Sequence, residues 1–567
     1  MRIYPIVVMK RSKKMSLVKT RAGVAGALAV GLVLALPGCE ISGDGALPGE
    51  DRVVEDIMET YVSARFRFYP VESTLSGLPG NDDRLGDFSR ASIDERIQWL
   101  TDFHYKLLGL KLTALSQPAY LDALWLTSLV KAELFELEVR SVWRRSASFY
   151  GDAARLGLVT LLAEGELASR TDALGARLAE IPVLFGQARE NLEPAASVWD
   201  ADARASLDAC GRLLEDLPKI IEGRLPPHRV AELAGLSRDA TRAIQDLLAA
   251  PPELQAGQTP LGFALGEEEL ERYFFYRHMV DWSLDEIALE AERELQAATN
   301  ALAELALERF PSKSLQAVLD PEPLAVPIET AVVAAESRAL AFLRERDGAS
   351  PLDASIPVRR VPAYFPGSEV VQLWRPKALE PARGAFLMVH DVAVPDAFEL
   401  ELLTLREIGG RARQYAFQAG STSLLRRVVS APATREGWLA RFERDVLADP
   451  SHQDSHELRI EHYQRAIVDF TRLLAQIGVH AHGQDVDGAA ELFRERAFMS
   501  DAAARAEAAR VAVDLRVGDA AIGRLLLDEL AAEYYRAYPL EPRSVFDDRV
   551  VEDGFLPVRL LRFRMLP

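Results

Sequence analysis

Residues 404–414 read TLREIGGRARQ, and EGW follows at 436–438, twenty-two residues after the glutamine. The two segments carry carboxylates, Glu407 and Glu436, of the kind that hold divalent metals or activate water. Arg406 and Arg411 stand beside them in the sequence. A guanidinium is permanently cationic and has no acceptor atom, so it repels a dication. If the two segments converge in the fold, we expect Arg406 or Arg411 to act as counter-ion to Glu407 and Glu436.

The residues around this site predict a mainly α protein. Long stretches rich in Ala, Leu, Glu and Arg repeat apolar residues at helical spacing, and short β-prone runs separated by Pro and Gly lie just before the site. We expect one large helical domain over 51–567, with two lobes around a cleft and a small β-sheet beside that cleft. The expected helices cover about 92–118, 120–147, 150–190, 225–250, 266–310, 396–419, 434–448, 455–479, 485–497 and 519–537, and the expected strands cover 356–361, 369–374 and 384–389.

The first forty residues are typical of a lipoprotein signal. A basic segment precedes an uncharged apolar run at 22–36, which is shorter than the roughly 20 residues of a transmembrane helix and fits a signal-peptide core. Leu36-Pro37-Gly38-Cys39 resembles a bacterial lipobox. Residues 1–38 are therefore predicted to be a signal peptide, Cys39 the lipidated residue and 39–50 a flexible tether. The alternative is an ordinary signal peptide that contains a cysteine.

The net charge limits the possible binding partners, and the cysteine content limits the possible disulfides. Removing residues 1–38 takes away seven basic and no acidic side chains, so the formal charge falls from -19 to -26. So acidic a chain argues against nucleic acid and anionic lipid surfaces as partners. Cys39 and Cys210 are the only cysteines, and acylation of the first leaves no internal disulfide. Glu40 follows Cys39 where an Asp favours retention in the inner membrane, so the expected location is the outer membrane, facing the periplasm.

Several motifs occur in a consistent order along the mature chain. They are PVESTLSG at 70–77, LGDFS at 85–89, GEEELERY at 266–273, SLDEI at 283–287 and IGVH at 477–480. In order and spacing the chain resembles the bacterial domain-of-unknown-function 885 family, over nearly all of its mature length. Members of that family resemble helical zincin-type metallopeptidases, so the resemblance implies a zincin-like (gluzincin-type) fold.

The central motif of that family is similar to L-x-x-H-E-x-x-P-G-H-H-L-Q, followed about two dozen residues later by E-G-W. Its histidines and later Glu resemble metal ligands, and the Glu beside the first His resembles the base that activates water. In this chain Arg406 stands at the first His position and Glu407 at the base position. After a one-residue deletion, Arg411 and Ala412 stand at the histidine pair, while Glu436 is kept. The resemblance thus implies zinc for the family and, in this chain, no metal and no cofactor.

Other readings of the site stay open at this point. A rival alignment takes His390 as the first ligand and Asp391 as the base, although it leaves forty-four residues before Glu436. In another, the arginines face solvent on a frayed helix near Gly409-Gly410. Further along, no tyrosine precedes Gly523, where the family has a phenol suited to stabilising an oxyanion.

The remaining histidines are weaker candidates. His480 is a possible catalytic residue, although beside His482 and Gly483 it is more typical of a structural histidine. His452, His456 and His462 fall in or near a polar segment after Pro450. We expect at most opportunistic surface metal binding there.

Two hypotheses about function follow. In the first, the protein is a membrane-anchored lipoprotein of the cell envelope with a degenerate metallopeptidase-like cleft, which binds a peptide or another envelope component without catalysis. In the second, it is a hydrolase or peptidase that works through a rearranged site around Glu407, Glu436 and His480. Whether the chain is an enzyme stays uncertain from sequence, and replacement of the metal ligands favours an inactive one.

Overall fold

The computed structural model describes residues 48–163, 166–249, 262–319, 322–347, 356–367, 369–375, 377–379, 385–390, 396–449 and 455–567. The predicted signal peptide, Cys39 and most of the tether lie outside the described residues. The tether prediction is wrong at its end, because residues 48–50 already belong to helix α1. Within the described ranges, no helix combines the length and the apolar character that crossing a bilayer requires.

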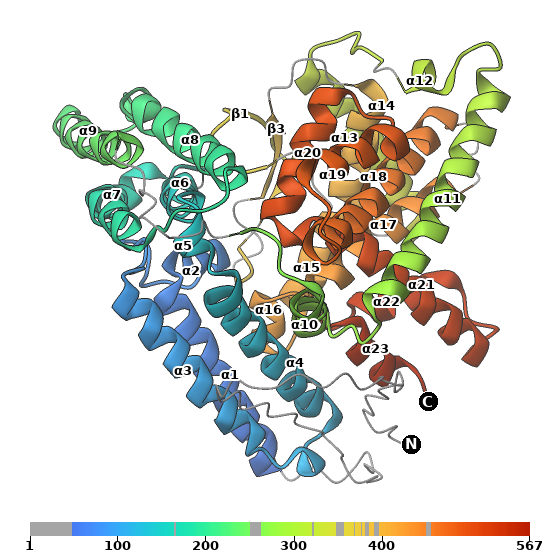
Figure 1. Ribbon diagram of the computed structural model, residues 1–567, viewed down its shortest axis with the longest axis horizontal. Coiled ribbons are helices and arrows are strands. Elements are labelled where there is room, and N and C mark those ends of the chain that lie inside the picture. Colours follow the sequence, from blue (N-terminus) through green and yellow to red (C-terminus); the bar gives the residue numbers. More distant parts are fainter. Residues whose placement is uncertain are drawn as a thin grey trace, which may run out of the picture.

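The N-terminal lobe consists of helices, blue to green in Figure 1. They are α1 (Pro48–Phe68), α2 (Pro70–Ser76), α3 (Arg90–Leu108), α4 (Gln117–Leu134), α5 (Val142–Arg145), α6 (Ser148–Ala163), α7 (Thr171–Asn191), α8 (Val198–Ile221) and α9 (Pro227–Ala249). The expected helix over 120–147 is interrupted, because α4 runs into a π-helix, η2 (Phe135–Arg140), before α5. The expected helix over 150–190 is two helices, α6 and α7.

The C-terminal lobe holds the remaining helices, green to red in Figure 1. They are α10 (Glu267–His278), α11 (Leu284–Arg309), α12 (Leu315–Val318), α13 (Ile328–Asp347), α14 (Ala397–Leu405), α15 (Ala412–Gly420), α16 (Leu424–Val428), α17 (Pro432–Leu447), α18 (His456–His480), α19 (Val486–Ala497), α20 (Asp501–Val513), α21 (Asp519–Ala537), α22 (Arg543–Val551) and α23 (Val558–Met565). A second π-helix, η4 (Arg406–Arg411), joins α14 to α15.

The described strands form one three-stranded sheet with the order β1-β3-β2. Strand β3 (Phe386–His390) pairs in parallel with β1 (Val358–Val361) and antiparallel with β2 (Val371–Trp374). Apart from its last residue β3 is buried, as a central strand covered on both faces should be. The prediction of a mainly helical protein with a small sheet is confirmed.

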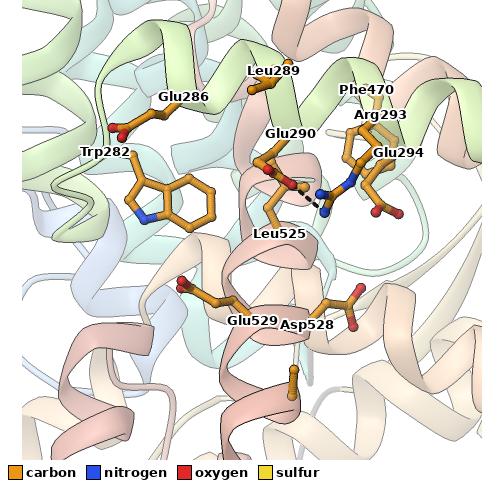
Figure 2. Close-up of a pocket in the computed structure, with 11 residues that line it drawn as sticks. Trp282, Glu286, Leu289, Glu290, Arg293, Glu294, Phe470, Leu525, Asp528 and Glu529 are labelled. Atoms are coloured by element: carbon orange, nitrogen blue, oxygen red, sulfur yellow. Dashed lines mark ion pairs between the residues drawn. The ribbon is translucent and has the colours of Figure 1, made fainter.

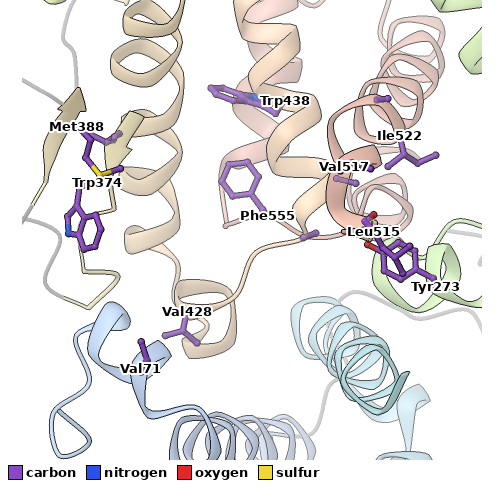
Figure 3. Packing of buried hydrophobic residues seen from close by; sticks show 14 of the residues in the cluster. Val71, Tyr273, Trp374, Met388, Val428, Trp438, Leu515, Val517, Ile522 and Phe555 are labelled. Atoms are coloured by element: carbon purple, nitrogen blue, oxygen red, sulfur yellow. Dashed lines mark hydrogen bonds between the residues drawn. The ribbon is translucent and has the colours of Figure 1, made fainter. Parts of the chain in front are cut away.

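Nearly all buried apolar side chains belong to one cluster, which runs from Val54 on α1 to Met565 on α23. Figure 3 shows part of it, with Trp438 on α17 and Phe555 among the residues drawn. A single cluster of this extent holds the two lobes together, since burial of apolar surface is the main stabilising contribution in folding. The helices that carry the candidate site are therefore anchored in the core.

Candidate functional site

The π-helix η4 sets the spacing of the two arginines. The amide of Ala412 donates to the carbonyl of Glu407, five residues earlier. In a π-helix this i to i+5 bond closes one turn, so Arg406 and Arg411 lie one turn apart on the same face. An α-helix has 3.6 residues per turn, so residues five apart in the sequence would point to different faces of it. The π-helix thus directs both guanidiniums toward one region.

Two glycines allow helix α17 to pack against η4. A Cβ on Gly409 would lie 2.6 Å from a ring carbon of Phe442, and one on Gly410 would lie 2.2 Å from Leu439 Cδ1. Both glycines are buried. The alternative of a frayed, solvent-facing helix at Gly409-Gly410 is therefore wrong.

Each residue of the EGW motif has a separate structural role. Gly437 lies where α17 crosses α21, and a Cβ there would be 2.3 Å from the carbonyl carbon of Gly523. Trp438 is buried, stacks on Phe442 with ring centroids 5.6 Å apart, and donates its indole N–H to the carbonyl of Asp547 at 3.1 Å. Glu436 points instead to the arginines. The motif fixes the position of α17 and presents one carboxylate.

Arg411 binds that carboxylate with both ends of its guanidinium. Its Nη1 lies 2.9 Å from Glu436 Oε1 and its Nη2 lies 2.8 Å from Oε2. The side chains are 13% and 18% exposed. Arg411 Nε is also 3.7 Å from Glu407 Oε1, and Arg435 Nε donates to Glu436 Oε1 at 3.0 Å. Bidentate pairs of this kind are among the strongest charge-assisted hydrogen bonds.

Arg406 extends the network to two residues that sequence reasoning missed. Its Nη1 donates to Glu443 Oε2 at 3.2 Å, and its Nη2 lies 3.8 Å from Glu436 Oε2. Glu443 in turn accepts a hydrogen bond from Nδ1 of His462 on α18. Glu443 and His462 are both buried. We call Arg406, Glu407, Arg411, Glu436, Glu443 and His462 the arginine–carboxylate network.

Signals for the two missed residues were present in the sequence. Glu443 follows Glu436 by seven residues, a spacing that places both on one face of a helix. His462 was assigned to a polar surface segment, and that assignment is wrong, because it lies within α18 and is buried. His456 begins the same helix, and His452 lies outside the described residues.

Glu407 links the network to the sheet. Its Oε2 accepts the amide N–H of Leu373 in β2 at 2.8 Å, and the side chain is buried. A base that activates water needs a lone pair free to face the substrate. One oxygen of Glu407 is engaged by the backbone and the other lies near Arg411. The base position of the family motif is thus held in place by two protein contacts.

The carboxylates of the network differ in how they titrate. Burial alone would raise the pKa of Glu436, but Arg411 and Arg435 outweigh burial and hold that pKa well below its usual value. Burial is likewise outweighed at Glu443, where His462 and Arg406 lower the pKa to about 2. At Glu407 burial prevails over the pull of Arg411, and the pKa is raised. Burial also lowers the pKa of His462. The network therefore favours the ionised form at Glu436 and Glu443 and disfavours it at Glu407.

These shifts predict opposite pH dependences for two variants. Glu443 has a lowered pKa in the folded chain, so its stabilising contribution is present above the unfolded pKa of about 4.3 and is lost as pH falls toward 2. Glu407 has a raised pKa, so its ionisation removes stability as pH rises. Unfolding midpoints from pH 3 to 8 should show Glu443→Gln losing most stability near neutrality. The unfolding midpoint of Glu407→Gln should rise relative to that of the native chain as pH rises. Parallel pH profiles for the two variants would contradict the opposite pKa shifts of Glu407 and Glu443.

The donors at this site do not fit a zinc ion. A zinc site takes three or four His, Cys or carboxylate ligands within about 2.3 Å of the metal. At the expected ligand positions the chain offers Arg406, Arg411 and Ala412, and the Arg411 guanidinium occupies both oxygens of Glu436. Throughout the part of the chain that the structure describes, no three His, Cys, Asp or Glu side chains are grouped closely enough to hold a metal ion.

His480 lies far from the network. It is eighteen residues beyond His462 on the same helix, a separation of about 27 Å at 1.5 Å per residue. His480 is buried, and its Nε2 is 3.0 Å from the carbonyl of Val511. Burial lowers its pKa to about 4. The structure thus does not bring His480 together with Glu407 and Glu436.

The rival ligand His390 stands at the end of β3. Its ring Nε2 would lie 2.7 Å from a Cβ placed on Gly367, so the ring packs against that glycine. Burial lowers the pKa of His390. Asp391, its proposed partner, lies outside the described residues.

A large cleft opens between the two lobes, and none of the six network residues lines it. We call it the interlobe cleft: α6 and α8 line one side, and α20 with the segment 363–367 lines the other. Its volume is about 1140 Å³, above the 300–1,000 Å³ of most small-molecule pockets. Aromatic side chains alternate with charged ones on its surface, among them Tyr69, Trp143, Trp199, Arg212 and Asp202. Such a lining suits a ligand with both apolar and polar groups.

A second hollow of about 490 Å³ lies between α11 and α21. Figure 2 shows Trp282 and the carboxylates of Glu286, Glu290 and Glu294 facing Asp528 and Glu529. Several of these acids already have cationic partners: Glu290 pairs with Arg293 at 2.5 Å, Asp528 with Arg444 at 3.1 Å and Glu529 with Arg562 at 2.6 Å. Its acidic lining is thus largely neutralised from within the protein.

Comparison with known proteins agrees with this architecture. The structure is similar to that of a predicted lipoprotein of unknown function from Shewanella oneidensis, with a TM-score of 0.71, 16% identity, and coverage of 91% of this chain and 100% of that one. It is also similar to a predicted lipoprotein from Colwellia psychrerythraea, with a TM-score of 0.73, 14% identity, and coverage of 91% and 98%. At these identities the likeness concerns the fold.

A search of curated proteins finds no match. The model of one bacterial family described as proteins of unknown function matches residues 70–565, most of the chain. The sequence resemblance to this family is thereby confirmed. The chain belongs to the DUF885 family of bacterial proteins of unknown function.

Proposed function

We propose that this protein is a lipid-anchored, non-catalytic binding protein of the cell envelope, built on a zincin-like scaffold in which arginines replace the metal. The observation that carries the proposal is the bidentate pair between Arg411 and Glu436. Glu436 occupies the position of a family metal ligand, and here its charge is satisfied by a guanidinium. Both oxygens of a carboxylate bound in this way face a guanidinium, whose permanent positive charge disfavours a dication at the same place.

The interlobe cleft is the proposed binding site. It lies between the two lobes, as ligand sites often do, and its size favours a peptide or another envelope component over a small metabolite. Anchoring would come from acylation of Cys39 in the outer membrane, with the domain in the periplasm. The described likeness to two predicted lipoproteins supports this location.

The metal-free site predicts a specific response to chelators. Purified protein should contain no stoichiometric zinc, and neither EDTA nor added zinc should shift its thermal midpoint, because a ligand that binds only the folded state would stabilise it. A variant with Arg406→His and Arg411→His should gain zinc-dependent stability, since both arginines approach Glu436. Adding Glu436→Gln should abolish that gain. Stoichiometric zinc in the native protein, lost on chelation together with peptidase activity, would overturn the proposal.

Binding in the interlobe cleft predicts a selective effect of filling it. Ala509→Trp on α20 places a large ring among the cleft residues. Ala532→Trp does the same in the hollow between α11 and α21 and serves as the control. Isothermal titration with short synthetic peptides and soluble cell-wall fragments should show affinity lost in the first variant and kept in the second. Equal binding by both variants would remove the cleft as the site.

A further inference from the structure

The start of helix α1 lies close to the proposed lipid anchor. Pro48, the first residue of α1, is only nine positions after Cys39. A fully extended segment of that length spans about 30 Å, at 3.3 to 3.6 Å per residue. If Cys39 is acylated, the N-terminal end of α1 is therefore held within about 30 Å of the bilayer surface.

Three other segments meet at this end of the N-terminal lobe. The amide of Ser116, before α4, donates to Asp51 Oδ1 at 2.9 Å, and Lys111 Nζ lies 3.7 Å from Glu50 Oε1. The start of α1, the end of α3 and the start of α4 thus form one tip, at the lower end of Figure 1. The side chain of Gln117 reaches the carbonyl of Phe563 at 3.3 Å, which ties α23 to the tip as well.

The tip presents apolar side chains to solvent. Val53 on α1 is 41% exposed, Tyr105 on α3 is 67% exposed and Leu108, one turn later, is 42% exposed. Exposed apolar side chains at one end of a molecule can mark a surface that contacts a partner or a membrane. In the described part of the chain, these three side chains thus remain exposed to solvent.

The segment 105–112, which covers the end of α3 and the residues after it, has a composition unusual for this chain. It reads YKLLGLKL, with a tyrosine, four leucines, two lysines and no acid. Only six lysines follow residue 38, and two of them, Lys106 and Lys111, lie in these eight residues. Tyrosine and lysine suit a membrane interface, because each buries an apolar stem while its polar end stays in water. The rest of the chain is strongly acidic, so this local exception indicates a specific surface.

We infer that the tip formed by Val53, Tyr105 and Leu108 rests in the interface of the membrane to which Cys39 is anchored, with Lys106 and Lys111 at headgroup level. This inference depends on the lipid anchor of the proposed function and adds the orientation of the domain. Glu50 and Asp51 beside the turn favour a zwitterionic lipid surface over an anionic one.

Orientation determines the position of the interlobe cleft. Helix α1 has 21 residues and is therefore about 32 Å long at 1.5 Å per residue. Tyr69, which lines the cleft, directly follows its C-terminal end. With the tip in the interface, α1 holds the cleft about 30 Å from the bilayer, within reach of a ligand in the space beyond.

The test uses the acylated full-length protein in vesicles of zwitterionic phosphatidylcholine that contain spin-labelled lipid. An environment-sensitive fluorophore is attached at Tyr105→Cys, and at Val183→Cys as the control, because Val183 on α7 is 61% exposed and lies away from the tip. Cys210 is buried, and native protein labelled in parallel corrects for it. Quenching at position 105 is expected to be several-fold stronger than at position 183.

A second variant tests contact with lipid as opposed to proximity. Leu108→Asp in the Tyr105→Cys background should lower quenching to the level of position 183, because a carboxylate disfavours the apolar interface. Equal quenching at both positions in protein that still sediments with the vesicles would overturn the orientation alone. Vesicle sedimentation that is unchanged by Cys39→Ala would overturn the lipid anchor instead, so the two failures are distinguishable.

Discussion

Gly523→Ala is expected to destabilise the C-terminal lobe by about 3 kcal/mol or more. A Cβ at this position would lie 1.9 Å from the carbonyl oxygen of Ala433 and 2.9 Å from the amide nitrogen of Gly437. Both neighbours are backbone atoms of α17, so relief requires α17 and α21 to separate. Overpacking of a core typically costs about 1–3 kcal/mol, and a clash with rigid backbone falls at or above the upper end of that range.

The measurement is the yield of soluble protein and the urea midpoint of whatever folds. Gly211→Ala is the matched control, because Gly211 lies in helix α8 and a Cβ there meets no atom within 4 Å. That control should be neutral or stabilised by roughly 0.5–1 kcal/mol, since alanine is the better helix former. Similar midpoints for the two variants would show that the helix crossing tolerates a methyl group.

Arg411→Met is expected to cost about 3 kcal/mol of unfolding free energy. Breaking a buried ion pair by removing one partner typically costs about 3–5 kcal/mol, because the other charge stays buried without compensation. The low end of this energy range applies here, because Glu436 still has Arg435 Nε at 3.0 Å and because the Glu436 side chain is 18% exposed. The raised pKa of Glu407 should rise further when the guanidinium is removed.

A double-mutant cycle measures this directly. Arg411→Met combined with Glu436→Gln should recover part of the loss, because neither charge is then left unpaired. The surface pairs of Arg494 with Glu491 and Asp501 provide the control, and Arg494→Met should cost much less unfolding free energy than Arg411→Met. If Arg411→Met costs no more than Arg494→Met, Arg411 has no role as the counter-ion of the site.

Sequence reasoning reached the main elements of this fold because their signals are local. The spacing of apolar residues predicted α17, α18 and α21 to within a few residues, and the alternation of β-prone runs with Pro and Gly predicted the strands. The expected helix over 266–310 is instead two helices, α10 and α11. The sequence also gives the sign of the charge at positions 406, 407, 411 and 436 directly. Helix propensity and charge depend on few neighbours along the chain, so they need no tertiary information.

The pairing of arginines with carboxylates could not be predicted from the sequence, because it depends on distances between segments that are far apart in the chain. Sequence alone paired the arginines with Glu407 and Glu436, whereas the structure pairs Arg406 with Glu443 and adds His462 from a different helix. The π-helical turn that aligns Arg406 with Arg411 was likewise invisible in the pattern.

The sequence was thus sufficient to indicate a helical protein of this family with Arg406 and Arg411 beside the carboxylates of its central motif. Only the packing of α17 against η4 and α21 decided which carboxylate each arginine neutralises. That packing depends on Gly409, Gly410, Gly437 and Gly523, residues that carry no chemistry of their own. Their importance appears only when two backbones approach within van der Waals contact, and no local propensity reports such an approach.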